Sequence, residues 1–100
     1  MRLEDAIQVQ VRDGQLVVSG DMDLATAPVL QKAVAKLGGG SIALDLSGVA
    51  FIDSTGLHLL IDLRRTHGRL RLVAGSPAVD KLLDLTGTRE YLFGRADRAG

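Results

Sequence analysis

The first part of the chain alternates apolar and polar residues on both sides of an Asp-Gly pair. Residues 7–11 and 16–19 have the period of two that is typical of half-buried strands. Asp13 and Gly14, which separate them, form a dipeptide favoured in two-residue hairpin turns. The pattern therefore predicts a β-hairpin at the start of the fold.

Three later segments change to the helical period, with apolar residues at the i, i+3, i+4 spacing of a helix that covers a core. These residues are Leu30, Ala33, Val34 and Leu37 in the first segment, Leu57, Leu60 and Ile61 in the second, and Val79, Leu82 and Leu83 in the third. We expect the first helix to begin near Thr26 and to end at the glycines 38–40. Ser76 should cap the third helix and Gly87 should follow its last turn.

Short apolar runs lie between these helices. Residues 42–46 and 70–74 predict strands, residues 91–93 predict a short edge strand, and residues 94–100 have no pattern and should be frayed. A helix that joins two neighbouring strands implies that the strands are parallel. The sequence predicts one α/β domain over residues 1–100, with its core over residues 7–93. It should be a mixed sheet of about four to five strands with three or more helices packed on it.

Composition excludes several classes of protein. Hydrophobic residues make up 46% of the chain but aromatic residues only 3%, so the core must be built from aliphatic side chains. The absence of cysteine excludes disulfides, thiolate metal sites and cysteine nucleophiles. Twelve basic and twelve acidic side chains cancel, which argues against direct binding of nucleic acid. No apolar run approaches the ~20 residues that span a bilayer, and no signal-peptide pattern opens the chain, so we expect a cytoplasmic protein without membrane insertion.

Ser54 stands where a strand gives way to a helix, directly after Asp53. We expect Ser54 to be the N-cap, with its hydroxyl facing the free N–H groups of the first turn. Such a position also suits a phosphate, because backbone donors and the helix dipole favour negative charge there. Ser54 is therefore a candidate phosphorylation site as well as a candidate cap.

A hydrolase and a metal site are the alternatives that these residues suggest. Ser54, His58 and Asp62 follow each other at i, i+4 and i+8, but this spacing places them along one helix face and does not converge them on one hydroxyl. A nucleophile elbow also needs glycine at the position of Ile52. His58 and His67 have no third ligand at useful spacing. We expect neither enzymatic activity nor a metal or other cofactor.

Three carboxylates lie in the turns after two predicted strands. Asp21 and Asp23 follow the second strand of the hairpin and Asp53 follows the next strand. If both turns emerge at the same edge of the sheet, these side chains gather around Ser54 and Thr55. We expect Asp23 to be a solvent-exposed turn residue whose loss changes stability little.

The segment Phe51-Ile52-Asp53-Ser54-Thr55-Gly56-Leu57 resembles the phosphoacceptor signature of the anti-sigma-factor antagonists, the single STAS domains of bacterial partner-switching pathways. Residues 18–23, 70–73 and 76–79 resemble further landmarks of this family in the same order. The resemblance runs from about residue 7 to residue 93 and implies a STAS fold.

The resemblance also implies a mechanism. The unphosphorylated protein would bind an anti-sigma factor with serine kinase activity, and phosphorylation of Ser54, with Thr55 in reserve, would end the interaction until a phosphatase restores it. The expected partner-binding residues are Asp21, Asp23, Asp53, Ser54, Thr55, Gly56 and His58. Two other STAS roles remain open, namely a subunit of a lipid-transport ABC complex and a scaffold that is not phosphorylated.

Overall fold

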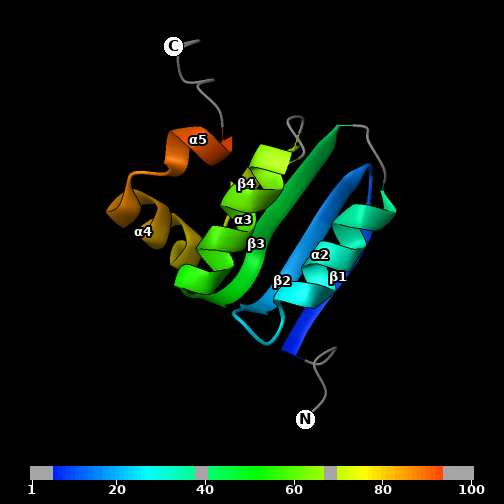
Figure 1. Ribbon diagram of the computed structural model, residues 1–100, viewed down its shortest axis with the longest axis horizontal. Coiled ribbons are helices and arrows are strands. Elements are labelled where there is room, and N and C mark those ends of the chain that lie inside the picture. The colour runs from blue at the N-terminus through cyan, green and yellow to red at the C-terminus, as the bar shows by residue number, and fades with distance from the viewer. Residues whose placement is uncertain (1–5, 38–40, 67–69, 94–100) are drawn as a thin grey trace.

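The computed structural model describes residues 6–37, 41–66 and 70–93 as a four-stranded sheet with helices packed on it (Figure 1). The elements in chain order are β1 (Ile7–Arg12), β2 (Gln15–Met22), α2 (Ala27–Lys36), β3 (Ile42–Ile52), α3 (Ser54–Thr66), β4 (Leu70–Gly75), α4 (Pro77–Thr86) and α5 (Arg89–Phe93). The sheet order is β1-β2-β3-β4, with β1 antiparallel to β2 and the other pairs parallel. The expected mixed α/β fold is confirmed.

The hairpin of β1 and β2 forms at the predicted turn. Arg12 pairs with Gln15, so only Asp13 and Gly14 lie outside the ladder. Their φ angles are 51° and 78°, the left-handed values that a tight turn of two residues requires. The Asp-Gly pair therefore fixes the register of β1 on β2.

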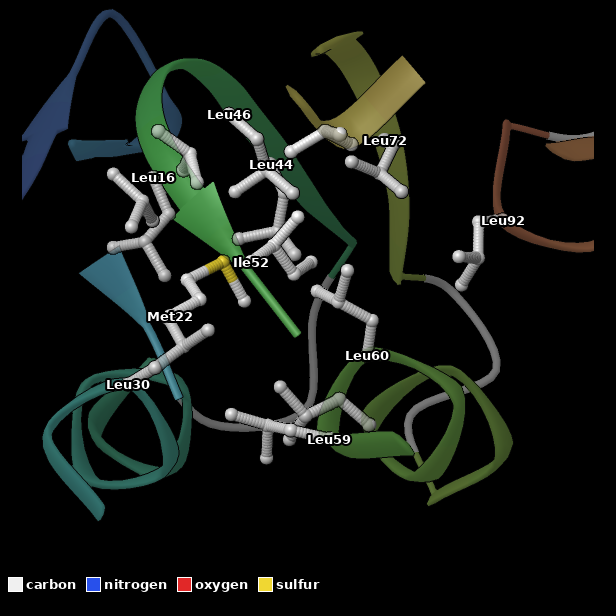
Figure 2. Close-up of a cluster of buried hydrophobic side chains, with 14 of the residues drawn as sticks. Leu16, Met22, Leu30, Leu44, Leu46, Ile52, Leu59, Leu60, Leu72 and Leu92 are labelled. Atoms are coloured by element: carbon white, nitrogen blue, oxygen red, sulfur yellow. The ribbon is translucent and has the colours of Figure 1, made fainter. Parts of the chain in front are cut away.

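Helices α2 and α3 lie on the same face of the sheet, and the core fills the space between (Figures 1 and 2). The close-up shows side chains of β2 and β3, such as Leu16 and Leu44, pointing toward Leu30 of α2 and Leu60 of α3. All four are buried. No described helix has the length and apolar character needed to cross a membrane. The core is aliphatic throughout, as the composition required.

Strand β3 is longer and less regular than its pattern predicts. It has 11 residues, whereas β2 has 8. Two of the three extra residues enter at register shifts, opposite Val17/Ser19 and opposite Gly20/Asp21, and the third, Ile42, precedes the first pair with β2. The two shifts break the alternation, so Val49 and Ile52 are buried while Phe51 is 48% exposed. The strand expected over residues 42–46 is therefore confirmed but extends further, because the ladder continues through two bulges to residue 52.

The C-terminal part is helical to the end of the described residues. Ser76 caps α4 by accepting a hydrogen bond from the Val79 N–H at 3.2 Å, and Gly87 ends the helix at φ 71°, as predicted. The edge strand expected over residues 91–93 is wrong, since Arg89–Phe93 form α5, whose Leu92 is buried. The apolar character of residues 91–93 alone does not distinguish a short strand from a short helix. The glycines 38–40, residue 67 and the tail 94–100 lie outside the described residues.

Candidate phosphorylation and partner-binding site

The loops after β2 and β3 emerge at the same edge of the sheet. The strands are parallel, and Met22 at the end of β2 pairs with Ile52 at the end of β3. The Asp53 N–H extends this pairing by donating to the Met22 carbonyl at 3.3 Å. The turn that carries Asp23 therefore lies next to the start of α3. Asp21 was expected in the same turn, but it belongs to β2, where it pairs with Phe51, because the strand continues to Met22. We call this region the acceptor edge, defined as residues 21–26 and 53–58.

Asp53, and not Ser54, is the N-cap of α3. Its carboxylate oxygen Oδ1 accepts a hydrogen bond from the Gly56 N–H at 3.0 Å, and its carbonyl accepts one from the Leu57 N–H at 3.0 Å. These are the two bonds that define a capping residue. The prediction of Ser54 as the cap is wrong by one residue, because two adjacent good capping side chains compete and the ladder ends at Ile52.

Ser54 consequently occupies the first position inside the helix with its side chain exposed. Within the described part of the chain its hydroxyl has no hydrogen-bond partner. Thr55, the reserve candidate, is half-buried. Of the two hydroxyl groups, that of Ser54 is the more accessible to an enzyme.

Gly56 allows the first turn of α3 to pack closely on the end of β2. A Cβ atom at this position would lie 2.6 Å from the Met22 carbonyl oxygen and 2.9 Å from Cγ1 of Ile52. A backbone oxygen cannot move aside as a flexible side chain can, so only glycine fits without displacement of the helix. Gly56 is buried, and its lack of a side chain lets the start of α3 lie directly against the end of β2.

The β2–α2 turn is held by hydrogen bonds between Asp23 and Thr26. The Asp23 carboxylate accepts from the Thr26 N–H at 3.1 Å, and the Asp23 N–H donates to Oγ1 of Thr26 at 3.0 Å. The Thr26 hydroxyl donates to the carbonyl of Asp21 at 2.8 Å, and Thr26 is only 1% exposed. Asp23 is therefore half-buried and structural in part, which corrects the expectation of a free surface carboxylate.

Leu24, at the tip of this turn, was missed by the sequence analysis. Its side chain is 75% exposed although the turn beneath it is fixed by Asp23 and Thr26. The signal was one large apolar residue in a turn that is otherwise polar or small. Leu24 thus adds an exposed apolar side chain to the acceptor edge.

His58 lies one turn after Ser54 and is exposed. Asp62 is engaged elsewhere, because its carboxylate accepts from the Arg65 guanidinium at 2.6 Å. The hydroxyl, imidazole and carboxylate thus do not form a hydrogen-bonded chain. Among the described residues, no group of three histidine or acidic side chains could hold a metal ion.

Comparisons with known proteins agree on one class. A family model described as "Mlab, STAS domain" matches residues 6–93, nearly the full chain, so the chain belongs to the STAS-domain family. The anti-sigma-B factor antagonist of Bacillus subtilis (strain 168) is 26% identical over 98 residues, covering 92% of this chain and 90% of that protein.

Solved structures extend the agreement. An anti-sigma factor antagonist from Mycobacterium paratuberculosis has 32% sequence identity and a TM-score of 0.70, with 89% of this chain and 84% of that chain covered. The unphosphorylated form of the anti-sigma factor antagonist SpoIIAA shares the fold, with 20% identity, a TM-score of 0.65, and coverage of 86% and 84%. This chain belongs to the STAS-domain family of anti-sigma-factor antagonists.

Proposed function

We propose that this protein is an anti-sigma-factor antagonist that is switched by phosphorylation of Ser54. The unmodified protein binds an anti-sigma factor with serine kinase activity through the acceptor edge and so releases a sigma factor. The bound kinase phosphorylates Ser54, the complex dissociates, and a phosphatase restores the unmodified form. The names of the relatives support the antagonist role. The exposed Ser54, beside a helix that Asp53 caps, supports the switch.

The separation of cap from acceptor explains how a switch can act without unfolding the domain. A phosphate adds about −1.5 to −2 charges at neutral pH. At the start of α3 this charge is favoured by the helix dipole, and the cap bond from Gly56 to Asp53 does not involve the modified hydroxyl. The folded state should therefore tolerate the phosphate.

A bound partner would tolerate the phosphate poorly. The partner must cover Ser54 and remove water from it, next to the carboxylate of Asp53. A loss of about 4 kcal/mol in binding free energy weakens affinity about a thousandfold. The proposed switch is thus a local obstruction of the acceptor edge, with Leu24 and His58 as neighbouring contacts.

The test begins with the partner. A tagged Ser54→Ala protein, which cannot be modified at this position, is used to purify bound proteins from the source cells. The purified partner is then incubated with ATP and each variant, and the phosphate is located by mass spectrometry. We expect one phosphate on Ser54 and none on the Ser54→Ala variant. Phosphate mainly on Thr55 would contradict the assignment.

Ser41 supplies the matched control, because it is an exposed serine directly before β3, at the opposite end of that strand. Ser54→Asp should weaken partner binding strongly and hold sigma-dependent transcription off, while Ser41→Asp adds the same charge and should change neither. Ser54→Ala should hold transcription on. Purification of ABC-transporter subunits instead would favour the transport role, and a stable complex without phosphorylation would favour the scaffold role.

A further inference from the structure

A second surface runs along β1, which is the strand at one side of the sheet, where this strand meets α2 (Figure 1). An open groove of about 810 Å³ runs between them. Its lining includes Val9 and Val11 of β1 and Val29, Lys32, Ala33 and Lys36 of α2. Much of this lining is apolar, and Val11 is 64% exposed. The helix thus leaves part of the edge strand uncovered.

The backbone of β1 offers hydrogen-bonding groups to this groove. In the sheet as described, β1 pairs only with β2, so one side of the strand is open. The two-residue turn makes Arg12 and Gln15 a hydrogen-bonded pair, and such pairs alternate along an antiparallel ladder. The N–H and C=O groups of Val9 and Val11 therefore point outward, where another strand could bind them.

Helix α2 contributes the charge. Val29, Lys32, Ala33 and Lys36 follow the i, i+3, i+4, i+7 spacing of one helix face, and all four line the groove. Neither lysine has an ion-pair partner in the part of the chain that the structure describes. The groove therefore combines an open strand edge, an apolar wall and two available ammonium groups.

We propose that this groove binds an extended segment of a partner protein in which apolar and acidic residues are interspersed. The segment adds to the sheet as a fifth strand through hydrogen bonds to the backbone of Val9 and Val11. Its apolar side chains pack against Val11 and Ala33, and its carboxylates face Lys32 and Lys36. This contact is independent of Ser54 and goes beyond the proposed switch.

A second copy of this protein fits the groove less well. Pairing of β1 with its own copy would set the lysine face of one α2 against the lysine face of the other. Four ammonium groups would then meet across the junction, and like charges oppose such a pairing. An acidic segment neutralises the same charges, which is why we assign the groove to a different chain.

The proposal is tested with peptides selected from a displayed library of random ten-residue sequences, using the whole protein as the target. We expect the selected peptides to be acidic and rich in apolar residues, and to shift the backbone amide NMR signals of β1 and α2. Peptides that instead shift the signals of residues 21–26 and 53–58, or basic peptides that bind equally well, would overturn the proposal. A concentration-dependent shift of β1 without peptide would assign the groove to self-association.

Two variants test separately how the lysines of α2 and the backbone of β1 contribute to peptide binding. The double variant Lys32→Glu/Lys36→Glu should weaken the selected acidic peptide about tenfold or more, whereas the control Lys81→Glu, an exposed residue on α4, should not change its affinity. Val11→Pro removes one outward N–H without removing a bond to β2, so the fold should persist while binding falls. Unchanged affinity in both groove variants would contradict the proposed mode of binding.

Discussion

Two serines stand at the start of helices that follow neighbouring parallel strands, and their environments are opposite. Ser76, before α4, is 4% exposed, and its hydroxyl accepts the Val79 N–H as a true cap. Ser54, at the start of α3, is exposed, and Asp53 accepts the corresponding bond from Gly56. The two junctions use the same kind of residue in the same part of the fold.

The two serines differ by one position relative to the start of the helix: Ser76 is the N-cap of α4, whereas Ser54 follows the N-cap of α3. A serine at the capping position is held by a buried hydrogen bond, so its modification would damage the helix start. The hydroxyl of a serine one position later makes no hydrogen bond within residues 6–37, 41–66 and 70–93, because the capping bond belongs to the preceding aspartate. The comparison shows that a serine at a helix start can be exposed and free of the capping role, which is what the proposed switch requires of Ser54.

The largest effect on stability should come from the packing beneath the acceptor edge. Gly56→Ala places a Cβ atom 2.6 Å from the Met22 carbonyl oxygen, so α3 must shift away from β2. We expect a loss of about 2 kcal/mol in the free energy of unfolding, measured by urea denaturation. His58→Ala, an exposed change on the same helix, is the control and should be nearly neutral. A neutral Gly56→Ala would show that the two elements are not closely packed.

The comparison of the serines gives the next effect. Ser76→Ala removes a buried cap and should lower the free energy of unfolding by about 1–2 kcal/mol. Ser54→Ala should change it by less than about 0.5 kcal/mol, because no capping bond is lost. Thermal melting of the two variants beside the unmodified protein measures this difference. Equal losses would mean that Ser54 also serves as a cap.

The loss of stability caused by Asp23→Ala should fall between those of Ser76→Ala and Ser54→Ala. Its carboxylate accepts hydrogen bonds from Thr26 within a half-buried turn, so Asp23→Ala should cost about 1 kcal/mol. Asp23→Asn keeps an acceptor oxygen and should recover most of that loss. If Asp23→Asn still binds the partner weakly while its melting temperature is normal, the negative charge of Asp23 contributes to binding as well as to the turn. Normal binding by Asp23→Asn would limit Asp23 to the turn.

The smallest effect concerns the end of α4. The Arg89 guanidinium donates a hydrogen bond to Asp84 at 2.7 Å and holds the pKa of that carboxyl below its ordinary range near 4. A lowered pKa in the folded state adds stability above the unfolded pKa, and this is lost as the pH falls through the folded pKa. Asp84→Asn should therefore be slightly less stable at pH 7 and lose its difference from the unmodified protein in strong acid. A difference that grows in acid would contradict this sign.

Local signals in the sequence were sufficient for much of the fold. Asp13-Gly14 predicted the hairpin, and Ser76 and Gly87 predicted the two ends of α4, because each acts through bonds to nearby residues. The parallel pairing followed from helices that join neighbouring strands. The turn and the helix ends depend on residues only a few positions apart, and the parallel pairing depends on the order of strands and helices along the chain.

The remaining features depend on contacts between distant segments. The bulges of β3 arise from its pairing with β2, which the apolar pattern of β3 alone does not contain. Helix α5 lies against β4 and α3, where Arg64 donates a hydrogen bond to the Tyr91 carbonyl at 3.2 Å. At the candidate site, the sequence located the acceptor edge but not the capping residue, since the end of the β3 ladder decides between Asp53 and Ser54.

The most direct test of the switch uses the protein with phosphoserine incorporated at position 54. Its free energy of unfolding and its affinity for the purified partner are measured beside those of the unmodified protein. We expect the free energy of unfolding to change by less than about 0.5 kcal/mol while the affinity falls about a thousandfold. Unchanged affinity, or a loss of affinity matched by a large loss of stability, would contradict a switch that acts at the surface of a folded domain.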